Sequence, residues 1–101
     1  MTRNVLIVGE SIVRRVSGLG LIVTFGSSSV EVAVCDGPTL VHVQCHSGGW
    51  VATQLGPDPC VRGQSVETRG QAAFRSSADP YVIAEFVGFI CERRLAIREA
   101  A

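Results

Sequence analysis

The strongest constraint on the fold is a series of short apolar segments between positions 20 and 55. Gly, Ser, Asp and Pro separate these segments, and such residues favour tight turns between strands. The segments are Leu21–Phe25, Val30–Cys35, Leu40–Cys45 and Trp50–Leu55. The pattern predicts an antiparallel β-meander of four or more strands, in which each strand pairs with the next along the chain.

The order of side chains in these segments also predicts the register of pairing. One face must collect the apolar residues, because a shift by one residue would set Val against Glu31 or His42. We therefore expect Glu31 to lie opposite His42 on a solvent-exposed face. Across the Asp36–Gly37 turn, the other expected pairs are Val30 with Val43, Val32 with Val41, Ala33 with Leu40 and Val34 with Thr39. Across the Ser-rich turn, they are Leu21 with Val34, Val23 with Val32 and Phe25 with Val30.

A helix is predicted at each end of the chain. Residues 4–17 carry apolar side chains at positions 5, 8, 12, 13 and 16, which is the spacing of one helix face. Gly9 weakens this helix by about 1 kcal/mol relative to Ala, and a short strand at Val5–Val8 is the alternative. Near the other end, Asp79 is a good N-cap and Pro80 suits the first helical position.

The C-terminal helix has a broad apolar arc. The arc comprises Val82, Ile83, Phe86, Val87, Ile90, Leu95 and Ile97, while Glu85, Glu92 and Glu99 form a narrow polar stripe. Such an arc needs more than one neighbour, so we expect the helix to pack on the sheet and also on the first helix or a partner. Between the meander and this helix, residues 56–64 are predicted to form a loop, and residues 65–76 to supply one or two short edge strands.

Composition places the chain among single-domain globular proteins. Its 101 residues, 47% of them hydrophobic, are too apolar for intrinsic disorder and predict one α+β domain spanning residues 1–101. The formal net charge of zero argues against a nucleic-acid binder, which needs a positive field. All nine basic residues are Arg, which is typical of a GC-rich bacterial genome. No segment resembles a signal peptide or a membrane span, so we expect a soluble, cytoplasmic protein.

The cysteines and histidines do not match a metal-binding or catalytic motif, and we expect no metal or cofactor. In the H-x-x-C-H cluster of His42, Cys45 and His46, residues 42 and 45 point to opposite faces of a strand, so their ligand atoms do not converge. A nucleophilic pairing of Cys91 or Cys60 with His46 has no oxyanion loop to orient it. The four cysteines form no C-x-x-C pair and are expected to be free thiols buried in the structure: Cys35, Cys45, Cys60 and Cys91.

These observations favour a small non-catalytic protein-binding module. Such a module would be an immunity or inhibitor-type protein, an accessory subunit or a chaperone-like adaptor. Its partner would be another protein, or a second copy bound through the C-terminal helix. The candidate interface or pocket residues are Trp50, His42, Glu31, Phe89, Arg93 and Arg94.

The alternative function is a small-ligand-binding domain or an enzyme, with a pocket between the sheet and the helices. Such a pocket would be lined by Phe25, Phe86 or Phe89, and by polar groups such as His42, Cys91 or Arg94. We expect Trp50 to be buried at one end of the core, because Trp is a highly buried residue on average. If Trp50 were exposed instead, it would be a candidate anchor of a protein–protein interface.

Overall fold

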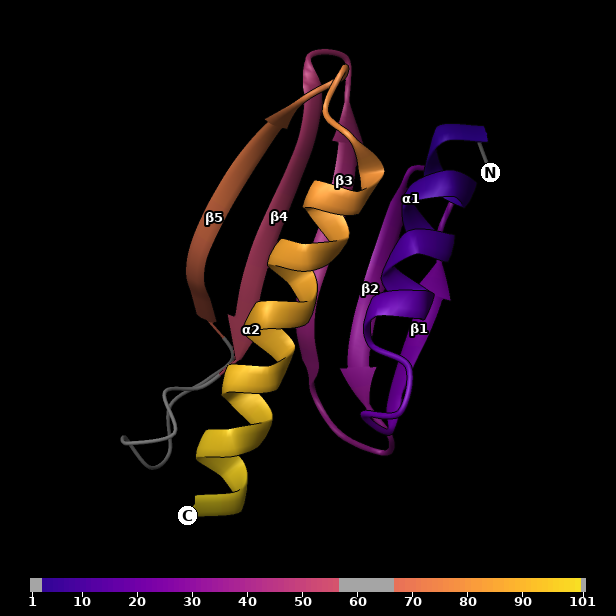
Figure 1. Ribbon diagram of the computed structural model, residues 1–101. Coiled ribbons are helices and arrows are strands. Elements are labelled where there is room, and N and C mark those ends of the chain that lie inside the picture. The colour runs from indigo at the N-terminus through magenta and orange to yellow at the C-terminus, as the bar shows by residue number, and fades with distance from the viewer. Residues whose placement is uncertain (1–2, 57–66, 101) are drawn as a thin grey trace.

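The computed structural model describes residues 3–56 and 67–100 of the chain. They form two helices and five strands, with one helix at each end of the sequence (Figure 1). The elements are α1 (Arg3–Arg15), β1 (Leu21–Phe25), β2 (Ser29–Val34), β3 (Thr39–His46), β4 (Gly49–Gly56), β5 (Glu67–Arg75) and α2 (Pro80–Ala100). The predicted α+β class is therefore confirmed, and Val5–Val8 belong to a helix rather than to a strand.

The five strands form one antiparallel sheet in the order in which they occur along the chain. Both helices lie on the same face of this sheet, with α1 over β1 and β2 and α2 over β3 and β4 (Figure 1). The two helices also pack against each other. The apolar arc of α2 thus packs on the sheet and on the first helix. Val82 is an exception, because it was expected in this arc but is 51% exposed, and the side chain of Ile97 lies outside the described residues.

The predicted register is confirmed for β1 with β2, and for β2 with β3 as far as the pair Val32 and Val41. Beyond this pair the prediction is wrong, because Ala33 lies opposite Thr39 and a β-bulge leaves Leu40 as an extra residue. Leu40 was expected beside Ala33 on the solvent face, but it is only 3% exposed and belongs to the core. The bulge turns the side chain of Leu40 from the solvent face towards the core. The N–H of Val34 donates to the carbonyl of Pro38 at 3.1 Å instead of pairing with Thr39.

The segment predicted to supply short edge strands forms the single nine-residue strand β5 at the sheet edge. Its residues pair with the whole length of β4, and the pairing is irregular between Gln54 and Leu55. Gly56 belongs to β4 rather than to the predicted loop. The remainder of that loop prediction, and Cys60 within it, lie outside the described residues.

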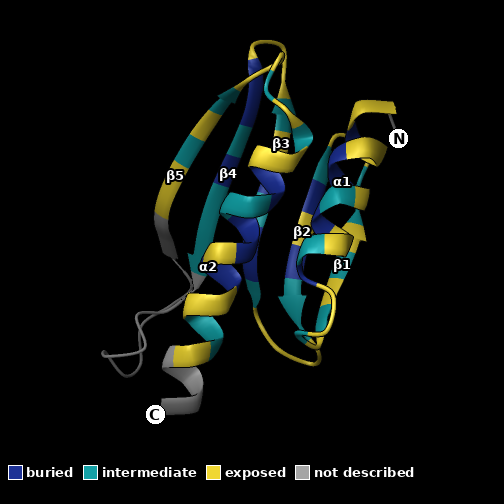
Figure 2. Ribbon diagram, viewed as in Figure 1, coloured by how far each residue is buried: buried dark blue, intermediate teal, exposed yellow. Residues whose placement is uncertain are grey.

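The core fills the space between the helices and the sheet, where Figure 2 shows the buried positions. α1 contributes Val5, Val8, Ile12 and Val16, and α2 contributes Ile83, Ala84, Val87, Ile90 and Cys91. One close approach depends on a glycine. A Cβ on Gly9 would lie 2.5 Å from Cζ of Phe25, so the missing side chain lets the ring of Phe25 pack against α1.

The start of α2 follows the capping prediction. The backbone N–H of Tyr81 donates to Oδ1 of Asp79 at 2.9 Å, and Pro80 occupies the first helical position. This cap satisfies one of the backbone donors that a helix N-terminus leaves without an intrahelical partner. Within the described residues, no helix is long and apolar enough to cross a membrane.

Candidate functional site on the outer face of the C-terminal helix

The outer face of α2 carries large apolar side chains that the core does not cover. Tyr81, Val82 and Phe89 are each more than half exposed. They remain exposed because the buried positions of α2 form one side of a helix with 3.6 residues per turn, which leaves these three on the other side. We call this surface the α2 outer face and define it by its residues Tyr81, Val82, Glu85, Phe89, Glu92, Arg93 and Ala96.

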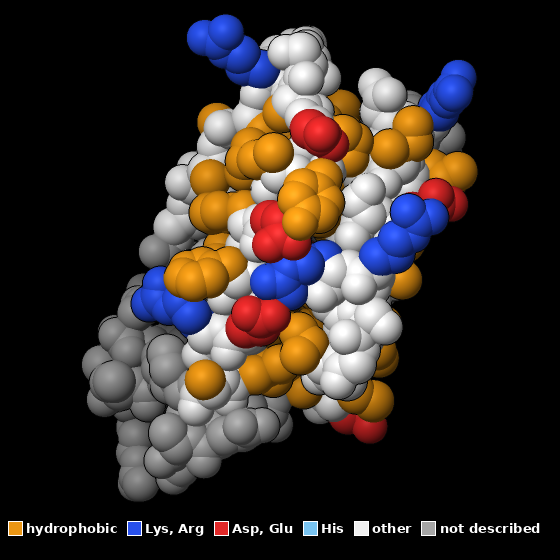
Figure 3. All heavy atoms as spheres, viewed as in Figure 1, with side chains coloured by type: hydrophobic (Ala, Val, Ile, Leu, Met, Phe, Trp, Pro, Cys, Tyr) orange, Lys and Arg blue, Asp and Glu red, His pale blue; other side chains and the backbone are white. Residues whose placement is uncertain are grey.

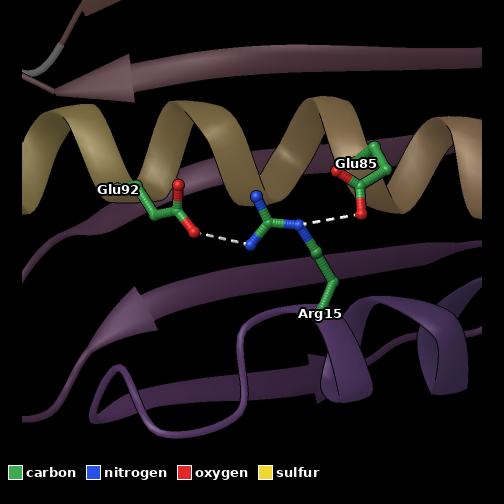
Figure 4. A network of polar contacts seen from close by, with 3 residues as sticks. All are labelled: Arg15, Glu85 and Glu92. Carbon is green, nitrogen blue, oxygen red and sulfur yellow. Dashed lines mark hydrogen bonds and ion pairs between the residues drawn. The ribbon is translucent and has the colours of Figure 1, made fainter.

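Charged side chains lie among these apolar residues. Figure 3 shows apolar side chains beside a line of acidic and basic groups over α2. Arg15 reaches across from α1, where its Nε lies 3.0 Å from Oε1 of Glu85 and its Nη1 lies 2.7 Å from Oε1 of Glu92. Figure 4 shows the guanidinium between the two carboxylates. The surface is therefore apolar with an internally paired set of charges.

The electrostatic effect of this cluster is mutual. Hydrogen bonds to Glu92 and Glu85 raise the pKa of Arg15, so the guanidinium stays charged. The hydrogen bond from Arg15 lowers the pKa of Glu92 below its ordinary value. Both ions are partly in water, with Arg15 22% and Glu92 49% exposed in the side chain. The cluster accordingly fixes where these side chains lie more than it stabilises the fold.

Two of the predicted site residues lie together on the α2 outer face. The guanidinium carbon of Arg93 lies 5.8 Å from the ring centroid of Phe89, which is within the range of a cation–π contact. Arg94, the next residue, turns to the sheet, where its Nη1 donates to the carbonyl of Leu55 at 2.6 Å. Arg94 therefore ties α2 to β4, while Arg93 stays with the exposed ring.

His42 and Glu31 lie elsewhere, on the sheet face opposite the helices. Nε2 of His42 lies 3.8 Å from Oε1 of Glu31, as the register predicted. Their pairing extends into a row of polar residues across all five strands, from Thr24 on β1 to Gln71 on β5. Nε2 of Gln71 donates to Oγ1 of Thr53 in this row at 3.3 Å.

Trp50 is buried, at 4% exposure, and belongs to the core, which confirms its expected burial. It lines two cavities, one of about 230 Å³ with His46 and Phe74 and one of about 200 Å³ with Ile7 and Pro80. A third cavity of about 280 Å³ lies between the end of α1 and β1. None of these three cavities is lined by the phenylalanines that we expected around a ligand pocket.

The described thiols and imidazoles do not converge. Cys45 packs against the core while His42 contacts Glu31 on the other face, which confirms that the two point in opposite directions. Cys35 is exposed, so the expectation that the thiols are buried is wrong for this residue. Cys91 is fully buried, and burial raises the pKa of its thiol to about 11. A thiol with that pKa stays protonated at neutral pH and is a poor nucleophile. In residues 3–56 and the described part of 67–100, no three His, Cys, Asp or Glu side chains gather as a metal site would require.

The structure thus separates the six candidate residues instead of joining them in one site. Phe89 and Arg93 share the α2 outer face, whereas the others lie in the core, at the helix–sheet contact or on the open sheet face. Sequence reasoning did not single out Tyr81, and it did not pair Arg15 with the glutamates of α2. The sequence did contain a signal for Tyr81. It lies two residues after the N-cap, and on a helix whose inner side carries Ile83 and Val87 this position faces outward.

No family model, curated protein or solved structure matches this chain.

Proposed function

We propose that this chain is a small non-catalytic protein-binding module that binds its partner through the α2 outer face. The observation that carries the proposal is the exposure of Tyr81, Val82 and Phe89 on one helix surface. Water-exposed apolar side chains that lie together on a helix stabilise the free protein little, but contribute strongly when a partner removes them from water.

The chemistry of this surface suits a protein partner. Tyr, Phe and Arg are enriched at protein–protein interfaces, where aromatic rings supply contact area and Arg supplies directed hydrogen bonds. Phe89 and Arg93 already lie in contact with each other. The carboxylates of Glu85 and Glu92 are paired with Arg15 within the chain, so a partner covering them would not have to neutralise them alone.

The proposed module fits the broad classes of an immunity or inhibitor-type protein, an accessory subunit or a chaperone-like adaptor. We place it in the cytoplasm, and the thiols of Cys35, Cys45 and Cys91 support this location because they are free. In each of these classes, the chain acts by covering a surface of its partner rather than by chemistry of its own.

Site-specific photo-crosslinking in cells tests this proposal. A photoreactive phenylalanine analogue at position 89 should form a crosslink to a protein, while the same analogue at position 22 should not. Ile22 is a matched control, because it is an exposed apolar residue on the opposite side of the molecule, 48% exposed against 55% for Phe89. Crosslinks from position 22 but not from position 89 would move the binding surface to the open sheet face and overturn the proposal.

A further inference from the structure

We infer that the partner of the α2 outer face is a second copy of this chain, with the two α2 helices antiparallel and Phe89 on the twofold axis. This inference rests on the proposed function and specifies its partner. In a twofold contact the same surface occurs on both sides, so it must be complementary to itself. The α2 outer face meets that requirement in both its charges and its apolar side chains.

The charges are arranged symmetrically about Phe89. Glu85 precedes Phe89 by four residues and Arg93 follows it by four. Four residues advance a helix by slightly more than one turn, so the two charges lie one turn to either side and are displaced from Phe89 by about 40° in opposite directions. An antiparallel pair about Phe89 brings Glu85 of each copy to the level of Arg93 of the other. The contact therefore gains two ion pairs of opposite charge.

A parallel pairing of the same helices does not have this complementarity. It would bring Glu85 beside Glu85 and Arg93 beside Arg93 of the second copy, and like charges at that spacing repel each other. The charge pattern thus selects the antiparallel arrangement. Arg15 contacts Oε1 of Glu85 from the side of α1. This contact holds the Glu85 carboxylate at the edge of the apolar surface.

The apolar residues follow the same symmetry. The two Phe89 rings meet at the centre, and Val82, seven residues before Phe89, comes opposite Ala96, seven residues after it. A large side chain then faces a small one on each side of the axis, which lets the helices approach closely. Arg93 already lies over the Phe89 ring of its own chain, so its guanidinium starts near the centre of the contact.

Sedimentation of the purified chain over a wide concentration range tests the self-association. We expect a monomer–dimer equilibrium that Phe89→Asp weakens at least about tenfold, because the change removes the central aromatic anchor. Ile22→Asp introduces the same charge at a similarly exposed apolar position and should leave the dissociation constant unchanged. A chain that stays monomeric up to about 1 mM, where even Kd values near 1 mM would be visible, overturns the inference.

A charge-exchange experiment tests the antiparallel register. Glu85→Arg and Arg93→Glu should each weaken the homodimer, because each sets two like-charge pairs in the contact. Mixing the two variants should restore a dimer that contains one copy of each, since every pair then joins opposite charges. Circular dichroism checks that both variants fold, because Glu85→Arg also removes one of the partners of Arg15. Folded variants that do not recover on mixing contradict the register.

Disulfide trapping gives a second measurement that does not change these charges. In a Cys35→Ser background, Phe89→Cys should form an 89–89 disulfide between copies on mild oxidation. Val82→Cys is the control, because position 82 faces position 96 in the antiparallel pair and should react much more slowly with itself. Equal rates for the two variants, with the linked peptides identified by mass spectrometry, would indicate parallel pairing and overturn the proposed arrangement.

The photo-crosslinking experiment separates failure of this inference from failure of the proposed function. A crosslinked product of twice the chain mass supports the second copy. A crosslink from position 89 to a different protein, with a monomeric purified chain, overturns the second copy while the protein-binding function stands. If the analogue at position 89 forms no crosslink to any protein, both the second copy and the protein-binding function are contradicted.

Discussion

Arg15 crosses α2 directly over Gly88. A Cβ at Gly88 would lie 2.5 Å from Cγ and 2.6 Å from Cζ of Arg15, so the Arg15 side chain occupies the space that any other residue would need. Glu85 and Glu92 lie one turn before and one turn after this glycine, and both contact the guanidinium. The glycine therefore allows α1 and α2 to be joined by a charged side chain laid flat on the helix surface.

Gly88→Ala should stabilise the chain by less than its helix propensity suggests. Ala is favoured over Gly in a helix interior by about 1 kcal/mol, but its Cβ displaces Arg15 from the two carboxylates. In an Arg15→Ala background the same substitution should gain the full amount of about 1 kcal/mol. Urea unfolding of the four proteins measures this coupling. Equal gains in both backgrounds would show that Arg15 does not need the glycine.

The ion pair between Arg15 and Glu92 should stabilise the fold at neutral pH and lose this effect in acid. The pKa of Glu92 is lowered in the folded chain, so its contribution is present above the ordinary carboxyl pKa of 4.5 and disappears as the pH falls through the folded value. Wild type should therefore unfold at a higher urea concentration than Glu92→Gln at pH 7. The two midpoints should converge as the pH falls through the lowered pKa of Glu92 in the folded chain, and a gap that widens in acid would contradict the pairing.

Gly9→Ala should destabilise the chain, although Ala is the better helix former. The added Cβ would clash with the ring of Phe25, and overpacking of this kind costs about 1–3 kcal/mol. Phe25→Leu in the same chain should recover part of the loss by shortening the side chain. Gly48→Ala is the control, because no atom lies within 4 Å of the position that its Cβ would take. Chemical denaturation distinguishes the variants, and an unchanged midpoint for Gly9→Ala would contradict the close approach.

The thiols should differ strongly in reactivity towards an aromatic disulfide reagent at pH 8. Cys35 is exposed and should react within the mixing time of a manual assay, whereas Cys91 is buried with a pKa of about 11. Thiolates are the reacting species, so Cys91 should be modified only when the chain unfolds. Peptide mapping with and without denaturant identifies each site. Rapid modification of Cys91 in the folded chain would mean that α2 opens readily from the sheet.

Much of the fold followed from local patterns. The alternation of Val with polar residues placed Glu31 against His42, and the cap at Asp79 located the start of α2. The bulge at Leu40 did not follow, because the residues around the Asp36–Gly37 turn are compatible with a regular register as well. Leu40 reaches the core only because the chain inserts it as an extra residue between two ladder pairs.

The candidate site was predicted less completely than the fold. Phe89 and Arg93 were named for their residue types, and the structure brings them together because they are four residues apart on a helix. His42 and Glu31 were also correctly paired with each other. That they lie on the opposite side of the molecule from Phe89 depends on both helices packing on one face of the sheet, which helical periodicity cannot indicate.

The sequence by itself determined the helices, the antiparallel meander, most of its register and the buried end at Trp50. These features rest on residues near one another in the chain, whose spacing sets which side chains share a face. Only the tertiary structure decided which side of α2 stays in water and how Arg15 meets Glu92, 77 residues later. Such contacts depend on the relative placement of two helices, which arises from packing a shared core rather than from any local pattern.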